Sequence, residues 1–199
     1  MKKLMSVLLT IFIVAIIIAG ISMMGLAGKD YVETKTVEKQ STEKAKELLS
    51  KEPIKREEFK PDFGEATGML VIDKIDADLP IVEGTHEDDL KKGVGHYEGT
   101  SYPLDDDQIL LSGHRDTVFK RMGELEIGDI MTIRMPYGDF EYEIVETKIV
   151  DADDRSIIVP HDEETLTVST CYPFGYIGDA PDRYIIDAKP VFKYEDDED

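Results

Sequence analysis

The chain opens with a long apolar run. Lys2 and Lys3 precede residues 4–27, which contain no charged side chain and are almost all apolar. About 20 apolar residues in a helix span roughly 30 Å, the thickness of the hydrocarbon core of a bilayer. A cleavable signal peptide has a shorter apolar region of about 7–15 residues. The pattern therefore favours an uncleaved transmembrane anchor at residues 1–28, although Gly-Leu-Ala-Gly at 25–28 leaves cleavage open.

The two lysines set the expected orientation of this anchor, because positive residues beside a transmembrane helix tend to stay in the cytoplasm. We expect a single-pass protein of the cell membrane, with a cytoplasmic N-terminus and the bulk of the chain outside. The next segment, residues 29–65, carries acidic and basic side chains in balance and few large apolar ones. It predicts an extracytoplasmic stalk, helical in part, that holds the following domain away from the membrane.

From residue 66 to residue 194 the pattern changes to short apolar or alternating runs, which predict β-strands. Residues 130–135 and 140–144 alternate between apolar and polar side chains, with turn residues Pro136-Tyr-Gly-Asp139 between them, so they predict a hairpin. The other predicted strands are residues 69–72, 79–82, 108–112, 166–170 and 184–188, with a short helical stretch at 86–92. Seven or eight short strands with little helix indicate one all-β domain, either a closed barrel or a sandwich.

The acidity of the chain narrows the classes of partner. Its 199 residues carry a formal net charge of −20, and the excess of acidic side chains lies in the domain and in an acidic tail at 195–199. Nucleic acids bind to clustered lysine and arginine, so a nucleic-acid partner is disfavoured. Carboxylates cluster at 105–107 and 151–154, as hard cations require, but neither cluster has the EF-hand spacing. Solvated acidic loops are the preferred interpretation, and no metal site is predicted.

Cys171 is the only cysteine in the chain. It ends the apolar run 166–171 and is followed by a loop, Tyr172-Pro-Phe-Gly-Tyr-Ile-Gly178. A chain that leaves the cytoplasm with one thiol has no partner for an internal disulfide. A buried spectator, an intermolecular bridge and a reactive nucleophile therefore remain open. The thiolate is the nucleophilic form, and its formation needs a base or a cationic neighbour.

His114 is the strongest candidate for that base among the four histidines. It follows a predicted buried strand and Gly113, where a titratable ring can face a cleft at the mouth of a barrel. The remaining histidines have simpler interpretations, at the surface for His86 and His161 and half-buried for His96.

Arg183 lies in Ala180-Pro-Asp-Arg183, directly before the last predicted strand. Its guanidinium offers five donors for an oxyanion or a substrate carbonyl, although its position alone favours a surface ion pair. Together with Gly113-His114-Arg115-Asp-Thr117 and Thr167-Val-Ser-Thr-Cys171, this run resembles in order and spacing the signatures of the sortases, the membrane-anchored cysteine transpeptidases of Gram-positive bacteria. Val168 replaces the usual leucine of the cysteine motif, which is a conservative change. The run from Cys171 to Arg183 most resembles class D.

The resemblance implies a closed eight-stranded sortase-type β-barrel with short helices, preceded by the N-terminal transmembrane helix. It also implies that Cys171 attacks the carbonyl carbon of the threonine in a Leu-Pro-x-Thr-Gly-like sorting signal, which is cleaved after that threonine. His114 would protonate the departing amine and then take a proton from the incoming one, while Arg183 would brace the substrate backbone and the oxyanion. Implied substrate-binding residues flank these groups, namely Thr170, Tyr172, Ala180 and Pro181.

The implied partners are surface proteins that carry an LPxTG-like C-terminal signal, a peptidoglycan precursor whose amino group accepts the acyl chain, and the cytoplasmic membrane. No organic cofactor is implied. Some sortases bind calcium through loop carboxylates, so stimulation by calcium stays open. Two other hypotheses remain. One is a cysteine peptidase that uses water as the acceptor, and the other is a non-enzymatic anchored domain that binds the cell wall and whose thiol is inert.

Overall fold

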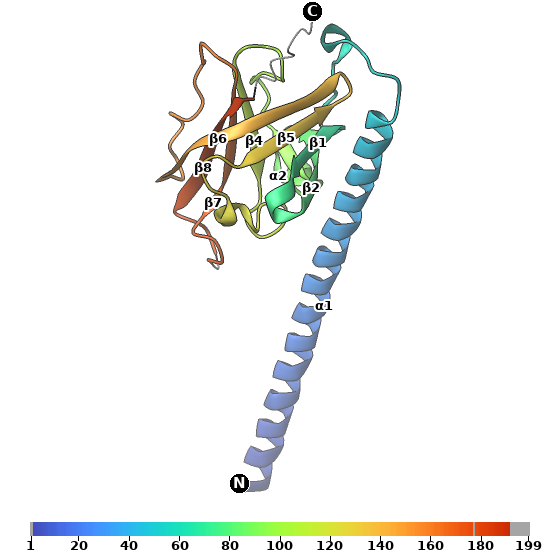
Figure 1. Cartoon of the computed structure of the whole chain (residues 1–199). Helices are drawn as coiled ribbons and strands as arrows, with labels where there is room; N and C mark the ends of the chain where they lie inside the picture. Colours follow the sequence, from blue (N-terminus) through green and yellow to red (C-terminus); the bar gives the residue numbers. More distant parts are fainter. Residues whose placement is uncertain (1, 177, 192–199) are drawn as a thin grey trace, which may run out of the picture. The chain divides into compact units, whose positions relative to one another are not determined.

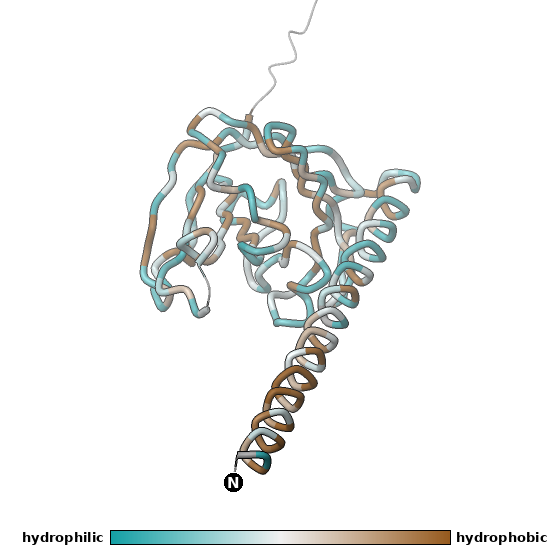
Figure 2. Tube along the Cα trace, turned by 90° about the horizontal axis from the view of Figure 1, so that it is seen from below, coloured by the Kyte–Doolittle hydropathy of each residue, from teal (hydrophilic) through white to brown (hydrophobic). Residues whose placement is uncertain are grey.

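The structure, a computed structural model, describes residues 2–176 and 178–191. Its first element is helix α1, Lys2–Leu49, whose N-terminal part forms the long brown apolar stretch of the tube in Figure 2. Among the described residues, α1 is the one helix long and apolar enough to cross a bilayer. An apolar helix is thus present where the sequence predicts the anchor. The acidic tail at 195–199 lies outside the described residues.

The chain divides into two compact units, residues 1–37 and 38–199. In its described residues, the second unit contains the end of α1, eight strands and four short helical turns. The strands are β1 (Ala66–Ile72), β2 (Ala77–Glu83), β3 (Val94–His96), β4 (Gln108–Gly113), β5 (Ile130–Met135), β6 (Gly138–Asp151), β7 (Thr165–Tyr172) and β8 (Asp182–Pro190). The helical turns are η1 (Arg56–Glu58), η2 (Asp73–Ile75), α2 (Glu87–Leu90) and η3 (Met122–Glu124).

The strands close into a barrel in the order β1-β2-β3-β4-β7-β8-β6-β5, and β5 returns to pair with β1. All neighbouring pairs are antiparallel except β2 with β3 and β4 with β7. Figure 1 shows β7 and β8 lying side by side next to the long strand β6. The prediction of a closed eight-stranded β-barrel with short helices is therefore confirmed.

One strand was missing from the pattern of predicted strands. β3 contains three residues, Val94-Gly-His96, and pairs with β2 on one side and β4 on the other. Three residues that include a glycine are too few to show an alternating pattern, so tertiary pairing rather than local propensity defines this strand.

The interior of the barrel is filled by alternate side chains from every wall. Tyr142, Phe119, Leu70, Ile109 and Leu166 are among the largest fully buried side chains. The outer face of β1 has its own small cluster, in which Ala45 near the end of α1 packs with Met69 and Val71. Burial of apolar area at about 25 cal/mol per Å² is the main stabilising contribution of such a core. This packed wall holds the ends of β4, β7 and β8 in fixed positions.

Candidate active site

Cys171 and Arg183 come from neighbouring strands at the same end of the barrel. Cys171 is the seventh residue of β7 and Arg183 the second of β8, and the antiparallel register makes them direct partners. Both residues are half-buried. Partners in an antiparallel pair project to the same side of the sheet, so the thiol and the guanidinium share one face.

His114 reaches the same end of the barrel from β4. Gly113 ends β4 and pairs with Thr170 in the parallel register of β4 with β7, so His114 follows at the level of Cys171. The Thr170 hydroxyl donates to the Gly113 carbonyl oxygen at 2.8 Å and ties the two strands together there. Two strand ends, rather than a flexible loop, therefore set the separation of the imidazole and the thiol.

All three predicted catalytic groups line one cavity of about 380 Å³. Its lining consists of His114, Arg115, Asp116, Cys171, Gly178, Asp179, Ala180 and Arg183. A nucleophile, a titratable ring and a permanent cation around one opening can support acyl transfer, in which a thiolate attacks a carbonyl and a donor holds the oxyanion. The Cys171 side chain is therefore open to this cavity, and it shares the cavity with His114 and Arg183.

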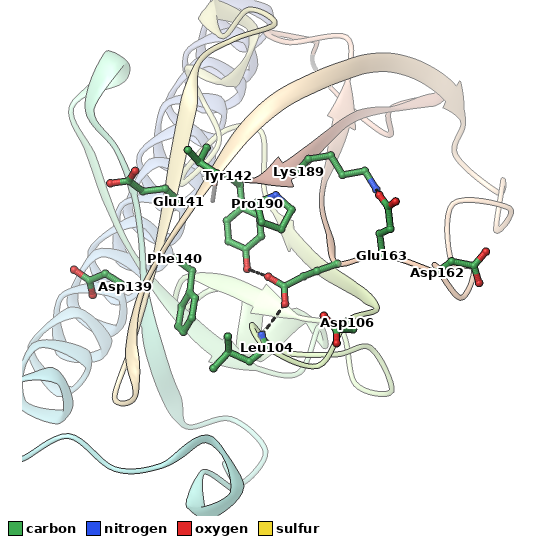
Figure 3. A pocket seen from close by; sticks show the side chains of 12 residues that line it. Leu104, Asp106, Asp139, Phe140, Glu141, Tyr142, Asp162, Glu163, Lys189 and Pro190 are labelled. Atoms are coloured by element: carbon green, nitrogen blue, oxygen red, sulfur yellow. Dashed lines mark hydrogen bonds and ion pairs between the residues drawn. The ribbon is translucent and has the colours of Figure 1, made fainter. Parts of the chain in front are cut away.

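A larger cavity of about 810 Å³ lies at the opposite ends of β7 and β8, near Glu164 and Lys189 (Figure 3). Its lining includes many carboxylates and some apolar side chains, but no cysteine, histidine or serine. By volume alone, the larger cavity would be the better candidate for the active site. The smaller cavity is the better candidate by its side chains, because it contains the thiol, the imidazole and the guanidinium. We therefore place the candidate active site at Cys171.

The carboxylates of the larger cavity do not converge on a cation site. Glu163 pairs with Lys189 at 3.3 Å. Glu164 accepts the Tyr142 hydroxyl at 2.7 Å and the Leu104 amide at 2.6 Å, and these two interactions are the dashed lines that start at the labelled Tyr142 and Leu104 in Figure 3. Within the described part of the chain, no three histidine, cysteine, aspartate or glutamate side chains are grouped as a metal site requires.

The four predicted substrate-binding residues occupy different environments. Ala180 lines the cavity, and the neighbouring Pro181 is exposed. Tyr172 packs in an aromatic cluster, with ring centroids 5.7 Å from Phe174 and 6.1 Å from Tyr184. Thr170 is only 3% exposed, and its hydroxyl is used by Gly113. Ala180 is thus the one of the four that lines the cavity, and Thr170 holds β7 against β4.

The other histidines do not reach the cavity. His96, expected to be half-buried, is 1% exposed, and its Nδ1 lies 2.8 Å from the Glu83 carboxylate. Tyr102 stacks on the His96 ring at 4.0 Å and donates its hydroxyl to Glu83. His86 is exposed and His161 half-buried. The His96 cluster therefore links β2, β3 and the loop before β4 as a structural element.

Arg115 is a cavity residue that the sequence did not single out. It follows His114 directly and is 7% exposed. The loop between Cys171 and Arg183 folds over it, and an arginine buried by a distant loop has the same local sequence as an exposed one. The sequence did offer one signal for Arg115, namely its position next to His114. A charged residue beside a candidate base lies in the same loop and can line the same cavity.

Comparisons with known proteins agree on one family. A family model described as the sortase domain matches residues 70–191. Sortase D of Bacillus subtilis (strain 168) is 61% identical over 134 residues, which are 67% of this chain and 68% of that protein. A solved Clostridium perfringens sortase D5 transpeptidase has a TM-score of 0.69 at 30% identity, over 79% of this chain and 99% of that one. Clostridium perfringens sortase C with the C-terminal cell wall sorting motif has a TM-score of 0.62 at 26% identity, over 81% and 90%.

Proposed function

The chain belongs to the sortase family, and we propose that it cleaves an LPxTG-like sorting signal after threonine and joins the protein to an amino group of a peptidoglycan precursor. Sortases are cysteine transpeptidases of the cell wall, and the similarity to sortase D proteins supports class D. The observation that carries the finer proposal is the single cavity shared by Cys171, His114 and Arg183.

The first half-reaction cleaves the signal. The Cys171 thiolate attacks the threonine carbonyl carbon, and the oxyanion that forms accepts hydrogen bonds from the Arg183 guanidinium. The carbon–nitrogen bond then breaks, and His114 gives its proton to the departing amine. A thioester to Cys171 remains, and the histidine is left neutral and ready to act as a base.

The second half-reaction joins the product. The amino group of the peptidoglycan precursor gives a proton to His114 and attacks the thioester carbon, so an amide forms and the Cys171 sulfur leaves as thiolate. One amide replaces another, so the exchange is close to neutral in free energy and needs no nucleotide. A sortase-type transfer of this kind uses no organic cofactor. We also propose that the reaction needs no bound calcium, which the melting midpoint with and without the ion tests.

The apolar part of α1 supports a single-pass anchor in the cell membrane, with Lys2 and Lys3 on the cytoplasmic side. Both substrates are themselves held at the membrane before they react. Anchoring the enzyme on the same surface raises its effective concentration for both of them without any new contact. The anchor and the catalytic barrel thus serve one reaction.

The test uses the full chain in detergent micelles, a Leu-Pro-x-Thr-Gly peptide and an added amine, with products identified by mass spectrometry. We expect a ligated adduct, and a loss of several powers of ten in turnover for Cys171→Ala and for His114→Ala. If Cys171→Ala cleaves the peptide as fast as the wild type does, the proposal is rejected.

The same assay separates the two other hypotheses. A peptidase yields the free acid alone even at high amine concentration, since water is its only acceptor. A non-enzymatic wall-binding domain cleaves nothing, and a thiol reagent labels its Cys171 slowly with no pH dependence near neutrality. Half-burial of Cys171 beside a titratable ring and a guanidinium favours the transpeptidase over an inert thiol.

A further inference from the structure

Arg115 is a nearly buried cation in the wall of the catalytic cavity, and its side chain is 6% exposed. Its Nη2 donates to the backbone carbonyl oxygens of Tyr176 and Gly178, each at 2.8 Å. Its guanidinium carbon also lies 5.9 Å from the centroid of the Tyr176 ring. The Arg115 side chain thus binds the loop between β7 and β8 at two of its residues, Tyr176 and Gly178.

The charge of Arg115 has little compensation. The Asp116 carboxylate lies 3.7 Å from Nε and is 69% exposed, and Nε has no hydrogen-bond partner among the described residues. A buried guanidinium with so weak an ion pair is expensive, and an apolar side chain of similar volume is often as good for stability. A purely structural requirement therefore does not explain an arginine at this position.

The loop gripped by Arg115 connects two of the catalytic groups. It starts after Cys171 and Tyr172 and ends before Arg183, and Gly178 and Ala180 from this loop line the cavity. From residue 175 to residue 180, as far as these residues are described, the hydrogen bonds to another segment are those from Arg115. Because Arg115 is bonded to His114 through the backbone, it links the segment of the base to the loop between nucleophile and oxyanion donor.

The two arginines of the cavity have different environments. Arg183 is half-buried, and the hydrogen bond from its side chain goes to the carbonyl of Asp182, its own neighbour, at 3.2 Å. Arg115 is buried and committed to loop carbonyls. Arg183 can therefore turn donors toward a substrate, whereas Arg115 acts through the loop.

We propose that Arg115 is a positioning residue, which fixes the β7–β8 loop against the His114 segment and so sets the cavity in which the scissile bond meets its three catalytic groups. This inference rests on the proposed transpeptidase function. A displacement of about 1 Å in such a site can cost roughly 10²-fold in rate. The strands still place Cys171, His114 and Arg183, but a displaced loop holds the scissile bond out of line with them in the transition state, so the loss falls on kcat.

The experiment compares Arg115→Met and Arg115→Lys with Arg134→Met in the full chain. Arg134 serves as the control arginine. It also has a long ion pair, 3.6 Å to Asp139, but its side chain is 50% exposed. Three measurements are made on each protein: kcat and KM with peptide and amine, amide hydrogen exchange in residues 175–182, and the melting midpoint. Arg115→Lys keeps the charge but lacks the planar fork, so it guards against a Met variant that fails to fold.

We expect kcat to fall about 10- to 100-fold in Arg115→Met and less in Arg115→Lys, with KM within about twofold and faster exchange in the loop only. Arg134→Met should match the wild type. Two results for Arg115→Met would overturn the proposal. One is a wild-type kcat although hydrogen exchange in the loop is faster, and the other is a reduced kcat although hydrogen exchange in the loop is unchanged. A wild-type protein that forms no adduct refutes the proposed function instead, while the exchange measurement still tests the grip of Arg115 on the loop.

Discussion

Cys171 and Arg183 are direct partners in the antiparallel pairing of β7 with β8. Opposed residues in such a pair have Cβ atoms about 4.5–5.5 Å apart. Backbone hydrogen bonds therefore set the spacing of the two Cβ atoms from which the thiol and the guanidinium extend, and the loop that joins the two strands can change without altering it. The loop instead shapes the wall of the cavity around them.

The first prediction concerns the guanidinium of Arg183. Arg183→Ala should lower kcat/KM for transpeptidation by about 10²–10³-fold, as removal of one oxyanion donor does. Arg183→Lys should recover only part of this loss, because an ammonium lacks the planar donors of arginine. Steady-state kinetics with peptide and amine give the values. Equal rates for the two variants and the wild type, at unchanged melting midpoints, would contradict a role in the transition state.

The buried cluster of Glu83, His96 and Tyr102 predicts a pH dependence of stability. Burial favours a raised pKa for Glu83, but the hydrogen bond and charge of His96 and the Tyr102 hydroxyl outweigh it and lower the pKa. A carboxyl with a pKa lowered by folding stabilises fully above its unfolded pKa of about 4.3. That stability is lost as the pH falls through the folded pKa.

Glu83→Gln should therefore unfold more easily than the wild type near neutrality, by about 1–3 kcal/mol, because His96 and Tyr102 lose a charged acceptor. The difference should shrink as the pH falls below about 4.3, where the carboxyl of the unfolded chain takes up a proton, and should be lost once the pH has passed through the lowered pKa of the folded state. Urea unfolding from pH 7 to pH 3 measures it. A difference that stays constant over this range would show that folding does not shift the pKa of Glu83.

Arg56 provides a third prediction, on how the stalk joins the barrel. Its guanidinium pairs with Asp105 at 2.5 Å and lies 5.4–5.8 Å from the ring centroids of Phe59, Tyr102 and Tyr137. Partly desolvated cation–π contacts contribute about 0.5–2 kcal/mol. Arg56→Ala should lower the free energy of unfolding by about 1–3 kcal/mol in total, measured by urea titration. Arg121→Ala loses a pair with Glu124 that is about half exposed and a donor to the Ile75 carbonyl oxygen at 2.7 Å, and it should cost less than Arg56→Ala.

Calcium gives a fourth prediction. The loop carboxylates already have protein partners, since Asp107 accepts the amides of Gln108 and His161, each at 2.7 Å, and Glu164 accepts the Tyr142 hydroxyl. A specific site saturated at about 100 times its Kd would add roughly 2.7 kcal/mol to stability. We expect no such gain in calcium over magnesium at equal ionic strength, measured as the melting midpoint. An upward shift specific to calcium would show that these loops rearrange around the ion.

The sequence predicted the parts of the site that lie on strands. Cys171 and His114 stand at the ends of apolar runs, and such runs predict strand ends at the mouth of a barrel before any tertiary contact is known. That these strands converge could be predicted only from the family resemblance. The parallel pairing of β4 with β7 joins segments more than 50 residues apart. Local pattern contains no information on such a pairing.

Burial of polar residues was the part that the sequence did not reveal. His96 follows Gly93-Val-Gly95, a run too short to indicate a core position, yet Glu83 from β2 makes its burial possible. Arg115 is buried because a loop from beyond β7 covers it. In both cases the compensating partner is distant in sequence, so only the folded structure could identify it.

A fifth prediction tests how closely the strand end controls His114. A Cβ at Gly113 would lie 2.6 Å from Cδ2 and Cε2 of Phe119, a fully buried ring. The same Cβ would lie 2.8 Å from Cγ2 of Val118, so Gly113→Ala must displace these side chains or the backbone that carries His114. We expect a loss of about 1–3 kcal/mol in unfolding free energy and of up to roughly 10²-fold in kcat.

Phe119→Leu in the same chain separates these two effects. Leucine removes the edge of the ring that the new methyl group would meet, so the double variant should be more stable and more active than additivity of the two single variants predicts. Coupling of about 0.5–3 kcal/mol is usual for residues in contact. Unfolding curves and kcat for the four proteins complete the cycle. Strict additivity would mean that Gly113 is required for some reason other than its contact with Phe119, and that the position of His114 is set elsewhere.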